Sequence, residues 1–385
     1  MKSNYVKATV ALALGATLPA AYATNGDQML GVTATQWGMA GAVVAAPQDA
    51  GTVLTNPAGL GFLEFDEARV DMGFGFMNPP RKANGVESDA NLYMIPSGAM
   101  AFRTTEHLTL GLGMAGLSGM GVDFDDIKPA APGNQNVVTT KQFFKIAPGF
   151  AYRASDNLSV GAALNIDYQS LAMDMNGTAP LHLPQNQVYG FGATLGLVYR
   201  ISDKLQFGAS YISKQDMHEF KWNTSNGTFS MTMDAPAQTT VGIAFRPDPG
   251  WLIEADVKHI AFSDVLDKVD LKTPAGTQVM KFGWDDQIVY ALAVQKEVNP
   301  KTQVRFGVNY GKSPIEAADV DNNIGSLAIT ERHLSAGLTR QIGNKVFGSF
   351  SYVRALPNEI TSNSGSGNKI ELEQNVVNLQ ISYKN

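Results

Sequence analysis

Apolar and polar residues alternate with a period of two along most of this chain. In residues 157–170 one face is apolar and the other is small or polar: Leu158, Val160, Ala162, Leu164, Ile166 and Tyr168 oppose Ser159, Gly161, Ala163, Asn165, Asp167 and Gln169. Because successive side chains of a strand point to opposite faces, this alternation predicts β-structure. A small or polar second face suits a wet lumen better than a dry core. The chain is therefore expected to form strands with lipid on one side and water on the other.

The pattern recurs in about fourteen segments of roughly ten residues, the length that crosses a bilayer when tilted. They begin near Ala68, Asn91, His107, Phe143, Asn157, Gln187, Lys204, Ala235, Trp251, Gln287, Lys301, Arg332, Lys345 and Leu372. Short connections such as 154–157 alternate with long polar ones such as 118–142 and 172–186. Short periplasmic turns and long outer loops are typical of outer-membrane barrels. The fold class predicted is all-β, a transmembrane antiparallel β-barrel spanning residues 66–385.

Composition agrees with this fold class and excludes several others. Charged residues make up 17% of the chain, below the roughly 25% usual for soluble domains. A soluble β-sandwich would also alternate, but it would not use two connection lengths in strict turn. The net charge of -6 argues against a nucleic-acid partner. With no cysteine, the chain has no disulfides or thiolate metal sites.

Residues 1–23 have the layout of a secretory signal. Lys2 and Lys7 flank the start, the apolar run ATVALALGATL follows, and Ala21 and Ala23 occupy the small-residue positions of a cleavage site. We expect cleavage before Thr24 and export to the outer membrane. A cysteine-linked lipid anchor is excluded by composition.

Residues 24–65 precede the first predicted strand and are rich in Gly and Ala. A barrel of about fourteen strands is too wide for its own side chains to fill, so it would leak unless something occupied the lumen. Asn56-Pro57 is a turn signal, because proline fixes φ and restricts the residue before it. We expect residues 24–65 to plug the lumen. The alternative is an extension lying beneath the barrel.

The stretch NGDQMLGVTATQWGMAGAVVAAPQDAGTVLTNPAGLGFL resembles the N-terminal hatch of the FadL family of outer-membrane transporters for long-chain fatty acids and aromatic hydrocarbons. The resemblance implies a monomeric fourteen-stranded barrel whose hatch contains the turn formed here by Asn56, Pro57, Ala58 and Gly59. It also implies a kinked third strand that offers substrates a side exit. The layout matches over the mature chain, whereas the specific motif is confined to the hatch. One departure is the ending ISYKN, which places Tyr383 two residues before the C-terminus.

The strand pattern itself points to a weak place in the wall. Pro96 and Pro148 lie in the middle of the second and fourth predicted strands, and proline cannot donate to a strand ladder. The strand between them is rich in glycine, which marks bulges and kinks: Gly111, Gly113, Gly116, Gly119 and Gly121. Unpaired backbone is tolerated in a bilayer only where it lines a cavity. We expect a lateral opening at Pro96, Gly113, Gly116, Gly119, Gly121 and Pro148. The alternative is that pairing closes around both prolines and that the glycines make room for the plug.

Two groups of residues are candidates for ligand binding. Apolar residues of the outer loops are expected to capture hydrophobic compounds, and methionine suits adaptable surfaces: Phe124, Ile127, Met173, Met175, Met231 and Met233. Lys258 and Arg305 face the predicted lumen and could bind a carboxylate headgroup. Glu254 and Asp256 share the face of Lys258, so ordinary ion pairs are an open alternative. The choice between fatty acid and neutral hydrocarbon therefore stays open.

No catalytic motif emerges. The histidines are scattered without metal-ligand spacing: His107, His182, His218, His259 and His333. His259 and Ser263 could pair, but nothing in the sequence orients them. The G-x-G-x-x-G match at 111–116 lies inside a strand, which argues against a dinucleotide site. We expect no enzyme and no cofactor. The expected function is passive outer-membrane transport of hydrophobic compounds, foremost long-chain fatty acids, with outer-membrane lipid at the exit. Alternatives are an aromatic hydrocarbon channel of the same fold or a general porin or adhesin barrel.

Overall fold

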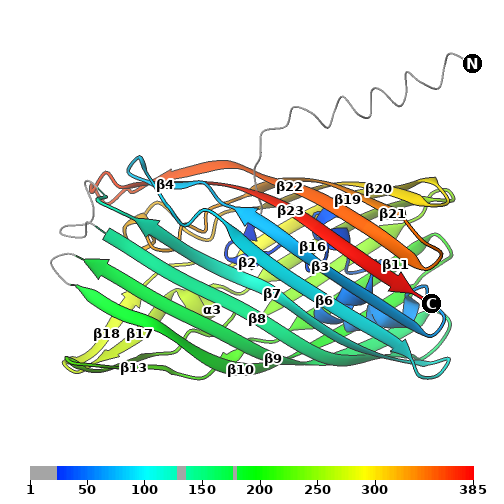
Figure 1. Cartoon of the computed structure of the whole chain (residues 1–385), viewed down its shortest axis with the longest axis horizontal. Helices are drawn as coiled ribbons and strands as arrows, with labels where there is room; N and C mark the ends of the chain where they lie inside the picture. Colours follow the sequence, from blue (N-terminus) through cyan, green and yellow to red (C-terminus); the bar gives the residue numbers. More distant parts are fainter. Residues whose placement is uncertain (1–23, 128–135, 177–179) are drawn as a thin grey trace, which may run out of the picture.

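A ring of 14 antiparallel strands encloses a lumen (Figure 1) in this computed structural model, which describes residues 24–127, 136–176 and 180–385. The wall strands are β3 (Ala68–Asn78), β6 (Tyr93–Arg103), β7 (Leu108–Phe124), β8 (Asn136–Arg153), β9 (Leu158–Asn176), β10 (Leu181–Arg200), β11 (Leu205–Ile212), β15 (Gln238–Phe245), β16 (Trp251–Ile260), β19 (Gln287–Asn299), β20 (Thr302–Gly311), β21 (Arg332–Gln341), β22 (Val346–Thr361) and β23 (Lys369–Lys384). Pairing of β23 with β3, from Asn375 opposite Asn78 to Lys384 opposite Arg69, closes the ring. The fourteen predicted segments all correspond to these strands. The predicted signal sequence, residues 1–23, lies outside the described residues.

Side-chain exposure confirms the predicted alternation. On β9 the inward-facing Asn165 and Asp167 are buried, whereas the outward-facing Leu164 is 52% exposed. On β10 the aromatic residues Tyr189 and Tyr199 end an exposed apolar stripe. An apolar outer face bounded by aromatic residues is what lipid and its interfaces require. None of the described helices is long and apolar enough to cross a membrane.

Strands β8, β9 and β10 have 18, 19 and 20 residues, far longer than the predicted ten. The prediction that 118–142 and 172–186 are loops was therefore wrong in part, because β7 to β10 extend into both segments. These extensions keep an apolar inner face, where Val137, Leu171 and Leu183 are buried. Packing of that face against other long connections explains why the strands continue beyond the apolar belt.

The long connections fold over one end of the barrel, called here the long-loop end. A second sheet forms there from β13 (Phe220–Thr224), β14 (Gly227–Met231), β17 (Lys268–Thr273) and β18 (Gly276–Lys281), drawn at the left of Figure 1. The other described elements of these connections are β4 (Arg81–Ala83), β5 (Val86–Glu87), β12 (Asp216–Met217), α3 (Ser263–Leu266) and η3 (Val320–Asn322). The indole Nε1 of Trp222 donates to the carbonyl of Pro184 at 2.7 Å and ties the second sheet to β10.

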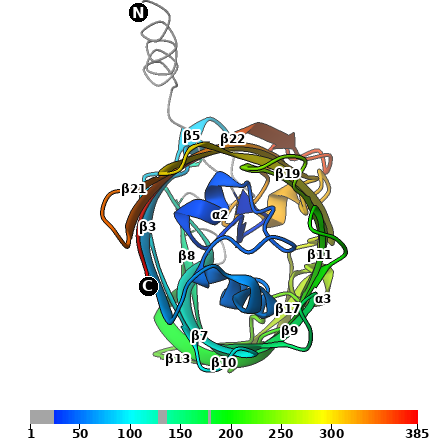
Figure 2. The same ribbon diagram turned by 90° about the vertical axis from the view of Figure 1, so that its right-hand side faces the viewer.

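Residues 24–65, called the hatch from here on, lie inside the ring of strands (Figure 2). They form β1 (Thr24–Asn25), β2 (Gln28–Met29), α2 (Ala34–Gly38), η1 (Ala50–Leu54) and η2 (Pro57–Phe62). The Thr33 side chain caps α2 by accepting a hydrogen bond from the Gln36 amide, and the Asp49 side chain caps η1 by accepting one from the Gly51 amide. Pro57 begins η2, where its fixed φ is already helical and its missing N–H is not needed.

Candidate functional site

Glycines of the wall form the seat of the hatch. Gly196 on β10 and Gly208 on β11 face inward, and a Cβ on them would lie 2.0 Å from the Asn56 Oδ1 and 2.2 Å from the Val44 carbonyl oxygen. A Cβ on Gly161 of β9 would lie 2.4 Å from the Ala58 amide nitrogen, and one on Gly242 of β15 would lie 2.6 Å from a methyl group of Val44. Gly161 pairs with Gly196 across the ladder, and Gly208 pairs with Gly242. This row of glycines therefore lets the hatch backbone approach the wall directly.

The turn Asn56-Pro57-Ala58-Gly59 fastens the hatch to this seat. The side-chain amide of Asn56 donates to the carbonyls of Val44 (2.7 Å) and Leu197 (3.2 Å), which joins two hatch segments to β10. The Ser159 hydroxyl donates to the Ala58 carbonyl at 2.7 Å, and the Gly59 amide donates to the Asn56 carbonyl at 2.9 Å. Asn56 and Ala58 thus make the hydrogen bonds that place this part of the hatch against β9 and β10, and Gly59 closes the turn on itself.

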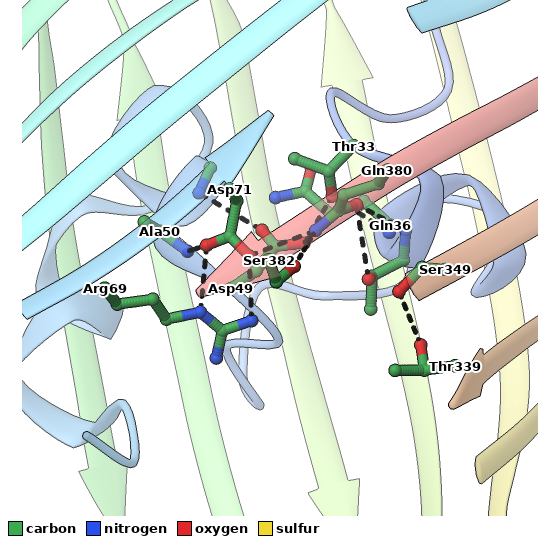
Figure 3. A network of polar contacts seen from close by, with 12 residues as sticks. Thr33, Gln36, Asp49, Ala50, Arg69, Asp71, Thr339, Ser349, Gln380 and Ser382 are labelled. Atoms are coloured by element: carbon green, nitrogen blue, oxygen red, sulfur yellow. Dashed lines mark hydrogen bonds and ion pairs between the residues drawn. The ribbon is translucent and has the colours of Figure 1, made fainter. Parts of the chain in front are cut away.

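A buried polar network fastens the hatch to β3 and β23 (Figure 3). Asp71 accepts the Ala50 amide at 2.8 Å and pairs with Arg69 at 2.8 Å. The Gln380 side chain donates to Asp71 at 3.1 Å and to Asp49 at 3.3 Å. Burial, and then the charge of Asp71, raise the pKa of Asp49. The network ties the first residues of η1 to β3 and β23.

Strands β6 and β7 separate part of the way along the wall. Their ladder runs from Arg103 opposite Thr109 to Ser97 opposite Ala115 and stops there. Beyond it β6 continues beside β3, while β7 continues beside β8 after a register shift between Gly116 and Ser118. The chain meets β7 again where the Asp89 amide donates to the Asp123 carbonyl at 2.9 Å. The gap along residues 116–122 of β7 is called the window.

A cavity of about 80 Å³ lies at the window. Its apolar lining comes from β6, β7, β8, the hatch and a long connection: Met94, Ile95, Met120, Phe144, Met29 and Leu327. Gly116 and Gly119 line it as well, and Pro96 immediately precedes the last paired residue of β6. The Gly121 carbonyl faces the gap and accepts hydrogen bonds from Arg81 and from the Tyr93 hydroxyl.

The first residues of the hatch cover the exposed edge of β7. The Gly119 amide donates to the Asp27 carbonyl at 3.2 Å, and Gln28 pairs with Ser118. The Asp27 carboxylate accepts hydrogen bonds from Lys141 at 2.8 Å and Ser118 at 2.7 Å, entirely out of solvent. Burial alone would raise the pKa of Asp27, but the Lys141 charge and these hydrogen bonds outweigh it and hold the pKa below its usual value.

Two residues predicted for the lateral opening lie away from the window. Pro148 interrupts the ladder between β8 and β9, but pairing resumes in the same register from Ile146 opposite Ile166 to Gly149 opposite Ala163. A Cβ on Gly113 would lie 2.7 Å from a methyl group of Val53, so this glycine makes room for η1. The structure thus groups Pro96, Gly116, Gly119 and Gly121 at the window and separates Gly113 and Pro148 from it.

The predicted apolar capture residues gather in one cluster at the long-loop end, called the chamber. Phe124, Ile127, Met173, Met231 and Met233 are buried within it, and Met175 packs against it. Their assignment to loops was wrong for three of them, since Phe124 lies on the wall strand β7 and Met173 and Met175 lie on β9, whereas Met231 lies on β14 within a long connection. Sequence reasoning missed Phe262 and Trp284, whose rings pack edge to face at 5.0 Å in the same cluster. The sequence signal that could have found them is that each is a single aromatic residue within a polar connection.

Lys258 and Arg305 both face inward but line different cavities. Lys258 and the buried Lys145 border a cavity of about 60 Å³ between hatch and wall. Arg305 borders a vestibule of about 900 Å³ at the short-turn end. Its guanidinium donates to Thr339 at 2.7 Å and to Gln303 at 2.9 Å. The two basic residues therefore cannot bind one headgroup together.

The remaining candidates offer no reactive arrangement. His259 Nε2 lies 3.0 Å from Asp286, and the Ser263 amide donates to the other oxygen of Asp286 at 3.0 Å. The carboxylate thus stands between histidine and serine instead of behind the histidine, where a nucleophilic triad needs it. The part of the chain that the structure describes contains no group of three or more His, Cys, Asp or Glu placed to hold a metal ion.

Several solved outer-membrane channels share this fold. The Pseudomonas putida toluene transporter TodX aligns with a TM-score of 0.78 at 18% identity, covering 92% of this chain and 99% of its own. The Ralstonia pickettii toluene transporter TbuX aligns at 0.74 with 17% identity, over 92% and 98% of the two chains. A Pseudomonas aeruginosa FadL homologue aligns at 0.76 with 15% identity, over 93% and 99%. No curated protein sequence matches significantly.

The family model described as outer membrane protein transport protein (OMPP1/FadL/TodX) matches residues 13–384. This match covers nearly the whole chain, and the 14-stranded barrel agrees with it. The protein is a transporter of hydrophobic compounds and not an enzyme. With the hatch, the window and the chamber in place, the chain belongs to the OMPP1/FadL/TodX family of outer-membrane transport proteins.

Proposed function

We propose that this transporter carries monoaromatic hydrocarbons from the long-loop end into outer-membrane lipid through the window. The observation that supports this route is the continuity of apolar surface from chamber to window. Phe143, Leu327 and Leu372 belong to the chamber and also line the window cavity. A solute that enters the chamber would therefore meet apolar side chains on its way to the window.

The size of the window cavity favours a single ring. A protein cavity of about 150 Å³ accommodates benzene, and the window cavity measures about 80 Å³. Flexible methionines line it, so modest rotamer changes of Met29, Met94 and Met120 would complete the space. A long acyl chain would need several such spaces in series.

Passage requires the first hatch residues to leave the edge of β7. In the closed arrangement Asp27 and Gln28 occupy the lumen side of the window. We propose that an arriving ligand binds better when residues 24–29 are displaced, so that it shifts the population toward the open window. Nothing in this scheme consumes energy, because transport is passive diffusion down a gradient.

Long-chain fatty acids are the second candidate, and one observation favours them. Lys145 and Lys258 border one small cavity between hatch and wall, where a carboxylate would meet two cations beside the buried Asp256. A general porin is less consistent with the structure, because the hatch fills the lumen that a polar solute would need. An adhesin role for the long connections stays an alternative without a supporting contact.

The proposal also covers the signal sequence of the chain and its oligomeric state. We propose that residues 1–23 are a signal sequence removed before Thr24, which would put the mature N-terminus inside the lumen. We propose a monomer, because β23 pairs with β3 of the same chain and leaves no open edge in the ring.

Uptake of radiolabelled toluene and of radiolabelled oleate, in cells with and without this protein, tests the proposal. A Cβ on Gly116 would meet Ile95 and Phe144 only at 3.4 and 3.5 Å, so Gly116→Ala is a tolerated control. Gly116→Trp should fill the window and reduce toluene uptake at least about tenfold, an effect of about 1.4 kcal/mol. Unchanged toluene uptake in Gly116→Trp would refute the lateral route. Protein-dependent uptake of oleate alone would replace the monoaromatic substrate with the fatty acid.

A further inference from the structure

Two buried carboxylates of the wall hold one segment of the hatch by its backbone. Glu254 and Asp256 lie two residues apart on β16, so both face the lumen. Each accepts two consecutive amide protons from hatch residues 43–46, and together they bind four in a row. The distances are 2.8 and 3.0 Å from Val43 and Val44 to Asp256, and 2.7 and 2.9 Å from Ala45 and Ala46 to Glu254.

The carbonyls of the same segment also bind side chains. Val44 accepts from the Asn56 amide at 2.7 Å, and Ala45 accepts from the Gln206 amide at 2.6 Å. Residues 43–46 therefore contact the wall through side chains and not through a strand ladder. Hydrogen bonds to an ionised carboxylate are roughly twice as strong as neutral ones. Such bonds can be broken without changing the register of the barrel.

Both carboxylates find their hydrogen-bond donors in the hatch and not in the described part of the surrounding wall. Among the described residues, no Lys or Arg nitrogen lies within 4.0 Å of either one, although Lys258 and Arg246 balance their charge from farther away. Glu254 Oε2 and Asp256 Oδ1 are buried without a hydrogen-bond partner in the described part of the chain. Lys145 is the other cation bordering the cavity that Asp256 and Lys258 share. Hydrogen bonds from the hatch amides are thus the principal interactions that these two side chains make.

We propose that Glu254 and Asp256 are positioning residues that hold the hatch as a seal against water and ions, separate from the window. Neither residue lines the window cavity, so the seal and the exit use different parts of the hatch. Neutralising the pair removes the charge from four hydrogen bonds at once and lets water pass between residues 43–46 and the wall. Acidification that protonates both carboxylates has the same effect.

Ion conductance in planar lipid bilayers tests this seal, and it is independent of any hydrocarbon substrate. In alkaline solution, where both carboxylates are ionised, Glu254→Gln/Asp256→Asn should raise the conductance at least about tenfold, because charge-assisted hydrogen bonds are lost. Asp167→Asn is the matched control, since Asp167 is an inward, fully buried wall carboxylate whose oxygens bind nothing in the described hatch. This control should conduct like the parent.

The pH dependence separates a seal made by charge from a general loosening of the fold. Parent conductance should be lowest in alkaline solution, where both carboxylates are ionised, and should rise as the solution is acidified, whereas the double variant should conduct at its high level throughout. Asp256→Asn alone provides a second measurement if the double variant does not form a barrel, and it should give an intermediate conductance. Conductance at the parent level in these variants, an equal rise in Asp167→Asn, or a parent that does not respond to acid would overturn the proposal.

Discussion

The buried ion pair between Asp27 and Lys141 should control how often residues 24–29 leave the window. Their side chains are 0% and 2% exposed, and the two charged atoms lie 2.8 Å apart. Asp27→Asn keeps the shape but leaves the Lys141 ammonium buried without its counter-ion. Removing one partner of a buried pair costs about 3–5 kcal/mol. Detachment of residues 24–29 relieves this cost by admitting water to Lys141, so the detached population should rise by about two to three and a half orders of magnitude.

Maleimide labelling can measure that population, because the chain has no cysteine of its own. Met29 lines the window cavity and is half-buried, so Met29→Cys supplies a single thiol that reacts faster when the segment has moved. The labelling rate should rise at least about 100-fold in Asp27→Asn. The variant Asp27→Asn/Lys141→Met should label more slowly again, since it removes the unpaired charge. A rate for Asp27→Asn within twofold of the Met29→Cys parent, on a folded barrel, would contradict the assignment of this ion pair as the closing contact.

Further predictions follow from other contacts. Because the folded pKa of Asp27 is lowered, its stabilising effect is complete above the ordinary value of 3.8 and is lost as pH falls below it. The labelling rate of Met29→Cys, divided by that of a free thiol at the same pH, should therefore rise only in that acid range. Hydrogen bonds from Lys272 and then Ser230 lower the pKa of Glu219 to about 2, so the amide protection factors in β14 and β17, taken against the intrinsic exchange rate at each pH, should stay constant down to about that pH. Leu379→Arg, on the lipid face, should lower the free energy of unfolding by about 2–4 kcal/mol in a denaturant titration in lipid, against an exposed control such as Lys82→Gln. Asp321→Ala removes the acceptor shared by Ser362, Ser364, Ser366 and Asn368, so a protease should cut 362–368 faster.

The barrel was predictable because its signal is local and repeated. A period of two determines which side chains of each strand point outward and which point inward. Leu164 could therefore be assigned to the lipid and Asn165 to the lumen from sequence alone. Strand ends were less predictable. The extensions of β8 to β10 depend on apolar partners such as Leu183, which pack against connections distant in the chain. The length of these strands therefore depends on tertiary packing, which the alternation of apolar and polar residues cannot predict.

The functional contacts were only partly predictable. A proline in a strand signals a missing donor, but its effect depends on which neighbour that donor would have faced. Pro96 precedes the end of a ladder, whereas pairing resumes beyond Pro148 in the same register. The sequence also carried no signal that Asp27 pairs with Lys141, 114 residues away, or that Glu254 and Asp256 bind backbone amides. Such pairings arise only once the hatch is placed inside the ring.

In the proposed transport route, the polarity of the two paths out of the lumen decides which one an apolar solute takes. The vestibule at the short-turn end is bordered by charged side chains, including Arg200, Arg246 and Arg305, and a solute released there would enter water. Transfer of an aromatic ring from an apolar site to water costs roughly 2–3 kcal/mol, which disfavours that path about 100-fold. Beyond the window lie the lipid-facing side chains of β6 and β7, such as the exposed Met94 and Met114. Exit through the window therefore exchanges one apolar environment for another, and the barrel needs no energy source to favour it, only a hatch segment that can move aside.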